Sequence, residues 1–403
     1  MKRQKKQSKI KILLITELVA LLLIAGFFAY TYKSGDRVEP QEAQASTEVE
    51  DTNDADGLLA TLLFASDYQY ESGWDEPRET LTKIIDASKA DGKMIDSLIM
   101  CGDYSNEYKQ YDYQISPEES ISEISSLAQS ECPSLKSDQI LFVQGNHDSL
   151  TESISDTGLH EYKDYLVYVL NTQNDFPWSQ GKTSGCLDKV RRSSEEMKRC
   201  FDELIEAGET RPVIIAGHVP LHFTARTSSR HTTGDNLYAS LVFDVVNEAA
   251  KSLDIVYLFG HDHSKGWDCY LGGGSVYKSV GDVLLIPKFD ENSVTTDEYS
   301  EERLNFTYMN AGYVGYYMNC GEDELANGSK ENYDAADMAL TGTVFELYPD
   351  RIVLTRYDTD GIHDMGGEGC ANPYKNYIDK GLIPESAYSK TVQGAQTIIR
   401  QHK

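Results

Sequence analysis

The chain has 403 residues, of which 40% are hydrophobic, so it can bury a sizeable core and is not disordered throughout. Acidic residues outnumber basic ones, 65 Asp and Glu against 37 Lys and Arg, which gives a formal net charge of −28. Binding to nucleic acid requires clustered Lys and Arg that neutralise phosphates, so we expect no nucleic-acid-binding surface.

The amino-terminal residues have a different character from the rest of the chain. Six of the first 11 residues are Lys or Arg, and the following 21 residues, 12–32, contain Glu17 as their only charge. About 20 apolar residues span a bilayer as a helix, and a basic flank keeps the amino end in the cytoplasm. The pattern predicts a cytoplasmic basic tail (1–11), a transmembrane signal anchor (12–32) and a flexible linker (33–56). The alternative, a cleaved signal peptide, would give a secreted protein.

After the linker, apolar strands alternate with amphipathic helices. The strands are predicted at 58–65, 98–101, 140–143, 165–170, 213–216 and 255–259, and the helices at 77–90, 117–128, 193–207 and 237–252. Ser193 and Glu196 have the spacing of a capping box, and Gly208 follows the same helix. Such alternation is typical of an α/β fold with a mostly parallel inner sheet covered by helices.

The carboxy-terminal part is richer in glycine, β-branched and aromatic residues. It contains three strand-like segments, 275–286, 305–313 and 343–357, and Pro349-Asp350 is a turn signal for a hairpin in the last of them. We expect this part to supply a second sheet. The predicted domain covers residues 57–370, and residues 371–403 form a polar carboxy-terminal tail without a predicted structure.

Five short motifs follow apolar strands and carry most of the functional information. They are Ser66-Asp67-Tyr68-Gln69, Gly102-Asp103, Gly145-Asn146-His147-Asp148, Gly217-His218 and Gly260-His261-Asp262-His263. Because the carboxyl ends of parallel strands meet at one edge of a sheet, these motifs should be neighbours in space. Their oxygen and imidazole groups suit a pair of divalent cations, and Asp103 is the expected bridging carboxylate.

The motifs also suggest how the reaction proceeds. Two cations lower the pKa of a bridging water, so the expected nucleophile is a metal-bridging hydroxide. His147 follows the ligand Asn146 and is placed to protonate the leaving oxygen, with Asp148 in a position to orient it.

In these motifs the chain resembles the calcineurin-like metallophosphoesterase superfamily, with four of five motifs matching over residues 58–290. The resemblance implies a four-layer double β-sandwich flanked by helices, with the metal site at the strand carboxyl ends. It also implies that Asp67, Asp103 and His263 bind one metal. Asp103, Asn146, His218 and His261 would bind the other. The departure is Gln69, where the family usually has histidine, although some branches are similar in having D-x-Q.

The expected function is that of an exported phosphoesterase that hydrolyses phosphate mono- or diesters of small molecules. The expected cofactors are two divalent metal ions, chosen from Mn, Fe, Zn and Mg, and Gln69 as a neutral ligand favours a harder ion such as Mn²⁺ or Mg²⁺. One alternative is a catalytically weak metal-binding envelope protein with the same fold. Another is a hydrolase of nucleotide or nucleotide-sugar pyrophosphates.

Two further groups of residues allow more than one interpretation. His222 and His231, with Arg226 and Arg230, form either a substrate-contacting loop or an ordinary solvated loop. Of seven cysteines, Cys101 is expected to be a small buried hydrophobe, and the other six allow 15 disulfide pairings.

Overall fold

The computed structural model describes most of the residues that follow the predicted linker. The described residues are 57–69, 76–105, 115–149, 151–171, 186–223, 238–261, 276–289, 298–315, 340–365, 381, 384–387 and 392–402. The chain divides into two compact units, Met1–Asn53 and Asp54–Lys403, and all described residues belong to the second. The predicted tail, anchor and linker lie outside the described residues. Among the helices that are described, none is long and apolar enough to cross a membrane.

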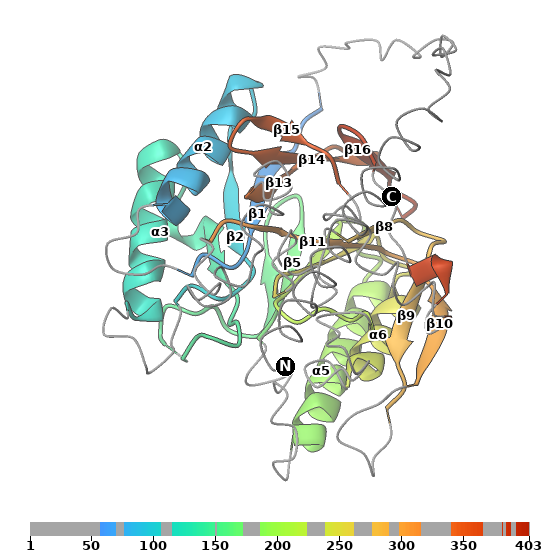
Figure 1. Cartoon of the computed structure of the whole chain (residues 1–403). Helices are drawn as coiled ribbons and strands as arrows, with labels where there is room; N and C mark the ends of the chain where they lie inside the picture. Colours follow the sequence, from blue (N-terminus) through green and yellow to red (C-terminus); the bar gives the residue numbers. More distant parts are fainter. Residues whose placement is uncertain are drawn as a thin grey trace, which may run out of the picture. The chain divides into compact units, whose positions relative to one another are not determined.

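Two alternating strand and helix units form the framework of the fold (Figure 1). The first contains β1 (Ala60–Ala65), α2 (Glu76–Ala90), β2 (Ser97–Met100), α3 (Pro117–Glu131), the 3-10 turn η1 (Ser137–Gln139) and β3 (Ile140–Phe142). The second contains β4 (Gly158–Glu161), β5 (Leu166–Leu170), α5 (Cys186–Glu206), β6 (Val213–Gly217), α6 (Ala239–Ala249) and β7 (Ile255–Phe259). The predicted alternation of strands and helices is therefore confirmed.

The remaining part of the chain is mostly β-structure. It contains β8 (Tyr277–Lys278), β9 (Val283–Pro287), β10 (Tyr299–Arg303), β11 (Thr307–Asn310), β12 (Gly312–Tyr313), β13 (Thr341–Leu347), β14 (Arg351–Asp358), β15 (Gly361–His363), the 3-10 turn η5 (Glu385–Ala387) and β16 (Gln396–Ile399). The expected hairpin turn at Pro349-Asp350 is confirmed, because Leu347 of β13 pairs with Ile352 of β14.

The strands form two large sheets and one small one. The eight-stranded sheet has the order β15-β14-β13-β1-β2-β3, with β12 beside β13 and β16 beside β14, and the six-stranded sheet has the order β4-β5-β6-β7-β11-β8. Strands β9 and β10 pair with each other. Within the large sheets, β1-β2-β3 and β5-β6-β7-β11 are parallel, and the other pairs are antiparallel.

This topology corrects the prediction of one parallel sheet and a second sheet from the carboxy-terminal part. Each alternating unit builds its own sheet, and the carboxy-terminal strands extend both: β13 pairs with β1, and β11 pairs with β7. Strand pairing depends on contacts between residues far apart in the chain, which periodicity does not report. Strand β16 pairs with β14, so the eight-stranded sheet continues into the segment that we expected to be a tail.

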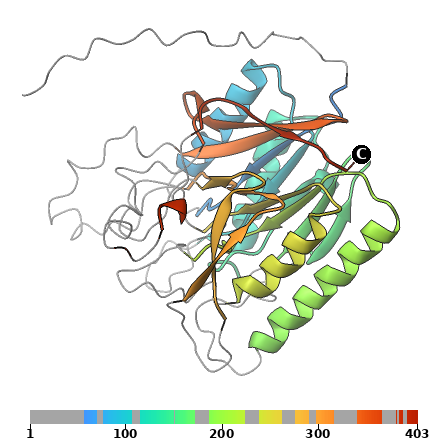
Figure 2. The ribbon, with the colours of Figure 1, turned by 90° about the vertical axis from the view of Figure 1, so that its right-hand side faces the viewer.

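Three apolar cores separate the layers. One lies between the two large sheets and includes Phe64 of β1 and Ile214 of β6. A second lies between the eight-stranded sheet and helices α2 and α3, and the third lies between the six-stranded sheet and helices α5 and α6. Figure 2 shows α2, in blue, on one side of the strands and α5 and α6, in green and yellow, on the other. The fold is α/β, as predicted, with helices on the outer faces of two stacked sheets.

Helix α5 begins earlier than the sequence predicts. It starts at Cys186, so Ser193 lies inside the helix and does not cap it. The reason is that Val190, one turn before Ser193, is fully buried against the six-stranded sheet with Met197 and Phe201. The apolar stripe therefore continues upstream of the expected capping box. The predicted end is confirmed, since Gly208 follows the helix in the left-handed conformation, at a φ of 68°.

Candidate metal centre

The loops after β1, β2, β3, β6 and β7 carry the five motifs and come together at one edge of the sheets. In these loops four residues other than glycine have a positive φ: 54° at Asp67, 45° at Gln69, 59° at Asp103 and 65° at His261. Such conformations cost about 1–3 kcal/mol each and persist where the surrounding structure enforces them. Here backbone bonds connect the first two loops, from Asp67 N–H to Gly102 O at 2.8 Å and from Gln69 N–H to Asp103 O at 3.0 Å.

Glycine is required where these loops approach one another. A Cβ atom at position 145 would lie 2.1 Å from Asp103 Oδ1, and one at position 260 would lie 1.8 Å from Ser66 Oγ. Both distances are far below contact distance. The glycines of the third and fifth motifs therefore allow the backbone to pack directly against side chains of the second and first.

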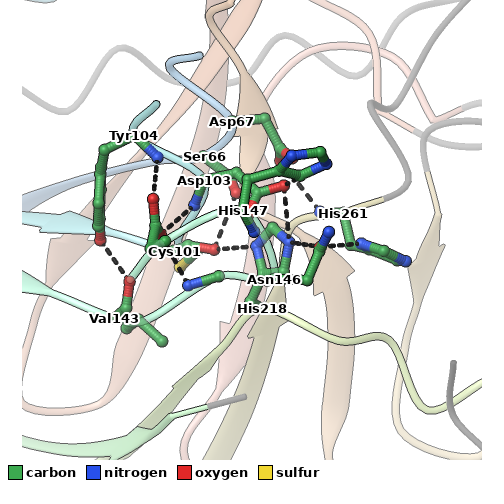
Figure 3. A network of polar contacts seen from close by, with 12 residues as sticks. Ser66, Asp67, Cys101, Asp103, Tyr104, Val143, Asn146, His147, His218 and His261 are labelled. Carbon is green, nitrogen blue, oxygen red and sulfur yellow. Dashed lines mark hydrogen bonds and ion pairs between the residues drawn. The ribbon is translucent and has the colours of Figure 1, made fainter. Parts of the chain in front are cut away.

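The side chains of Asp103, Asn146, His218 and His261 point toward one another (Figure 3). Asn146 Oδ1 lies 2.9 Å from His218 Nε2 and 2.7 Å from His261 Nδ1, and Asp103 Oδ2 lies 3.2 Å from His218 Nε2. The donor atoms of Asp103, His218 and His261 all lie within 4.8 Å of one another, and these three residues are buried. The structure thus brings together the four residues expected to hold the second metal.

The orientation of His218 is set by the backbone. Its Nδ1 donates a hydrogen bond to the carbonyl oxygen of Cys101 at 2.7 Å, so its Nε2 faces Asp103 and Asn146. An imidazole held in this way by a carbonyl group is the usual arrangement of a metal-binding histidine. Burial alone would lower the pKa of His218, but the Asp103 carboxylate reverses this effect and raises the pKa to about 9.

The donor set fits a divalent cation. His218 Nε2 faces two oxygen acceptors, the Asp103 carboxylate and the Asn146 carboxamide oxygen, and only a proton or a cation between them makes this arrangement favourable. In addition, Asp103 Oδ2 is buried and accepts no hydrogen bond among the described residues. Carboxylate, carboxamide and imidazole donors are the ligands that Mn, Fe and Zn take in proteins.

The first motif lies next to this cluster. Asp67 is fully buried, and its Oδ2 accepts the His261 N–H at 3.0 Å, which joins the loops after β1 and β7. Gln69 is also buried and is held through its backbone by the Asp103 carbonyl. His263, the remaining predicted ligand of the first metal, lies outside the described residues. Of the residues expected at the first metal position, the structure thus describes Asp67, Gln69 and Asp103.

His147 lies at the partly open side of the cluster. Its backbone N–H donates to Asp103 Oδ1 at 2.8 Å, its Nε2 lies 3.9 Å from Asp103 Oδ2, and its side chain is 11% exposed. Burial alone would raise the pKa of Asp103, but His218 and His147 outweigh it and hold the pKa below its usual range. Asp103 therefore stays ionised at neutral pH, as a metal ligand requires.

Asp148 has a different position from the one that we expected. Its Oδ2 accepts the backbone N–H groups of Asp103 and Gly145, and its Oδ1 accepts that of Tyr104, each at 2.8 Å. Burial and the charge of Asp103 raise its pKa to about 7. Both carboxylate oxygens are thus engaged by backbone groups, and the prediction that Asp148 orients His147 is wrong. Asp148 instead fixes the loops of the second and third motifs.

Sequence reasoning missed one segment at this edge. Residues 310–315 begin at the last residue of β11 and run beside the first motif, where Val314 N–H donates to Ser66 O at 3.1 Å. The sequence contains a pattern that could have indicated this segment. Asn310 and Gly312 come directly after apolar residues that end at Met309, as the five motifs come after apolar strands.

Several other expectations are settled by burial. His222 is buried against Phe259 and Tyr308, and its Nδ1 lies 2.8 Å from the Tyr308 hydroxyl, so it belongs to the core and not to a substrate loop. Arg226, Arg230 and His231 lie outside the described residues. Cys101 is fully buried, as predicted, and Cys101, Cys132 and Cys200 are free thiols.

With the site described, comparison with known proteins identifies the family. The model of the calcineurin-like phosphoesterase family matches residues 60–265, about half of the chain, and the chain therefore belongs to this family. It is a metallophosphoesterase, a hydrolase of phosphoric esters that uses divalent metal ions. No curated protein sequence matches the chain.

The chain is also similar to solved structures, at low sequence identity. A dimetal phosphatase from Danio rerio has 10% identity and a TM-score of 0.44, with 76% of this chain and 98% of that chain covered. A purple acid phosphatase from yellow lupin (Lupinus luteus) seeds has 8% identity and a TM-score of 0.39, with 85% and 54% covered. PhoD has 10% identity and a TM-score of 0.41, with 80% and 76% covered. The family assignment does not depend on these likenesses.

Proposed function

We propose that this metallophosphoesterase is exported, uses two divalent metal ions and hydrolyses phosphate mono- or diesters of small molecules. The observation that carries this proposal is the convergence of the buried residues Asp103, His218 and His261 and the half-buried Asn146 from both sheets. In this site one carboxylate faces two imidazoles and a carboxamide oxygen. Such a site binds a cation, and the cation in turn binds a phosphate.

The chain supplies residues for two metal positions. The first position comprises Asp67, Gln69, Asp103 and His263, and the second comprises Asp103, Asn146, His218 and His261. When bound, the metal ions supply a water-derived nucleophile and neutralise charge that develops on the phosphate. Because Gln69 replaces a usual imidazole by a neutral oxygen donor, Mn²⁺ or Mg²⁺ suits the first position better than a softer ion.

The remaining catalytic task belongs to His147. As the bond to the leaving oxygen breaks, negative charge builds on that oxygen, and a nearby imidazolium is able to donate a proton to it. His147 is held next to the cluster by its own N–H bond to Asp103, and its side chain is partly exposed where a substrate would enter. Asp103 stays ionised between the two positions, and Asp148 holds the loop that carries His147.

The test is hydrolysis by the purified full-length protein. We expect turnover of a mono-aryl or bis-aryl phosphate after addition of Mn²⁺ or another divalent ion, and we expect Asp103→Ala to abolish it. Asp202→Ala, at an exposed position on α5, is the matched control and should retain full activity. An absence of turnover with every divalent metal, across monoester, diester and pyrophosphate substrates, would contradict the proposal.

Gln69 supports a second candidate function, a metal-binding envelope protein with little turnover. This candidate and the hydrolase differ in metal content and activity. About two metal equivalents with measurable turnover favour the hydrolase. One equivalent or none, without turnover on any phosphate ester, favours the binding protein. The same substrate panel separates simple esters from nucleotide and nucleotide-sugar pyrophosphates.

We also propose that residues 12–32 anchor the protein in the cell membrane with the catalytic domain outside the cytoplasm. The support is the apolar run of 21 residues behind six basic residues. The protein should fractionate with membranes and be degraded by protease added to intact cells or spheroplasts. Recovery of a shortened chain from the medium would indicate cleavage instead, and resistance to protease until lysis would contradict export.

A further inference from the structure

The chain crosses from one sheet to the other next to the first metal position. Strand β11 belongs to the six-stranded sheet and β12 to the eight-stranded sheet, and Ala311 is the single residue between them. Ala311 N–H donates to the Phe259 carbonyl at the end of β7, and Gly312 pairs with Gly342 of β13. We call residues 310–315 the crossing segment. Through these bonds it links β7, the strand before the His261 loop, with the eight-stranded sheet that contains the Asp67 loop.

The crossing segment is in direct contact with the first motif. Besides the bond from Val314 N–H to Ser66 O, a Cβ atom at position 315 would lie 2.3 Å from the Asp67 carbonyl oxygen and 3.1 Å from that of Tyr68. Gly315 does not have a positive φ, so glycine is needed here for the close approach and not for an unusual backbone conformation. Any side chain at this position would displace the loop that carries Asp67 and Gln69.

A buried cation holds the crossing segment from the other side. Arg356 of β14 is 1% exposed, and its guanidinium donates to the Asn310 carbonyl and to Thr343 Oγ1. Thr343 Oγ1 in turn donates to the Ala311 carbonyl at 3.0 Å. Burying a guanidinium is costly unless its donors are satisfied, so these bonds fix the crossing segment firmly. We therefore expect a side chain added at Gly315 to shift the Asp67 loop and not the crossing segment.

We propose that the crossing segment positions the first metal site, with Gly315 as the residue that sets the place of Asp67. This inference rests on the proposed two-metal site. Asp67 and Gln69 both have strained, left-handed backbone conformations, and the packing of Gly315 on their loop helps to maintain them. The three atoms nearest to a Cβ at position 315 belong to Asp67, Tyr68 and Tyr313, and none belongs to a residue of the second metal position.

The experiment compares metal content in the full-length protein. After equilibration with Mn²⁺, the wild type should retain about two equivalents and Gly315→Ala about one, measured by inductively coupled plasma mass spectrometry. In a calorimetric titration with Mn²⁺, the affinity of the first metal position should fall roughly 10–100-fold. A loss of this size is usual when a residue that orients a metal ligand is changed. Gly208→Ala is the matched control. It should destabilise the protein, because alanine disfavours the left-handed conformation after α5, but a Cβ there meets no neighbouring atom. This variant should retain both metal ions.

A double variant separates positioning from general loss of structure. Asp67→Ala removes a ligand of the first position and should itself reduce metal content to about one equivalent. If Gly315 acts through Asp67, the double variant Asp67→Ala/Gly315→Ala should bind as much metal as Asp67→Ala alone. A further loss in the double variant, or two equivalents of unchanged affinity in Gly315→Ala, would overturn the inference. Fewer than two equivalents in the wild type would instead contradict the proposed two-metal site.

Discussion

His147 and Asp148 are adjacent in the chain, yet their surroundings assign them different tasks. The His147 side chain lies beside the ligand cluster and is partly exposed, whereas the Asp148 carboxylate is fully buried beneath the loops. One backbone step separates a partly exposed residue beside the ligand cluster from one that supports the loops of the site. This distinction leads to opposite expectations for conservative substitutions at the two positions.

Asp148→Asn should destabilise the protein and weaken metal binding. A carboxamide has one acceptor oxygen, so it leaves at least one of the backbone N–H groups of Asp103, Tyr104 and Gly145 without a partner. We expect a loss of about 2–3 kcal/mol, measured by chemical denaturation of the metal-free protein. His147→Gln is the contrasting variant: it should keep stability and metal content but lower kcat by roughly 10²–10⁴-fold. Equal loss of stability in both variants would contradict these assignments.

The helices and strands show how far local patterns are reliable. Strands β1, β2, β3, β6 and β7 occur within two residues of their predicted positions, because runs of apolar β-branched residues between turn signals are a local property. The S-x-x-E pattern is less reliable. At Ser116 and Glu119 it is a real capping box at the start of α3, but at Ser193 and Glu196 it lies inside α5. Burial of Val190 against a distant sheet makes the difference, and no local pattern reports it.

The turn that leads from α5 to β6 offers a test by pH. Glu209 accepts bonds from Arg211 Nε and Nη2 at 3.0 and 2.7 Å, and Arg211 also donates to Glu161 of β4. The bond with Arg211 lowers the pKa of Glu209 from 4.5 to about 2. Between these values the unfolded chain binds a proton that the folded protein does not, so the stabilisation is present above pH 4.5 and is lost as the pH falls toward 2.

Glu209→Gln should therefore reduce stability at pH 7 and flatten its dependence on pH between about 4.5 and 2. Because this ion pair is partly open to solvent, we expect a loss of no more than about 1 kcal/mol at pH 7, measured by urea denaturation at a series of pH values. Glu195→Gln, at an exposed position of α5, is the control and should leave the pH dependence unchanged. An unaltered slope in Glu209→Gln would show that the bond to Arg211 contributes nothing.

Across the domain as a whole, the carboxy-terminal residues join the two sheets at the end opposite the strand carboxyl ends. Arg400, directly after β16, is 7% exposed and bonds to the Tyr348 and Pro349 carbonyls in the β13–β14 turn. It also bonds to the Thr210 carbonyl and the Asp254 carboxylate, which precede β6 and β7. A segment without a predicted structure thus links the eight-stranded and six-stranded sheets.

Arg400→Met should destabilise the folded domain by about 3–5 kcal/mol, because it leaves the Asp254 carboxylate buried without its cation. Chemical denaturation measures the loss, and kcat/KM of the protein that remains folded should not change. Arg351→Met is the control: its pair with Asp350 is exposed, so we expect a loss below about 1 kcal/mol. Similar stability of the two variants would mean that the carboxy-terminal link is dispensable.

The order of the ligand-bearing motifs, the strands before them and the α/β class are all readable from the amino-acid sequence, because each depends on residues within one turn or strand. The sequence does not reveal the partners of Asp148, the contact of Gly315 with the Asp67 loop or the two-sheet topology. Asp148 bonds to the backbone of Asp103, 45 positions away, Gly315 packs on Asp67, 248 positions away, and Ala60 of β1 pairs with Leu347 of β13, 287 positions away. Such contacts form when burial of large apolar surfaces outweighs the entropy of closing long loops, which is a property of the whole fold. The sequence therefore predicts which groups bind metal, and long-range packing sets how they are held.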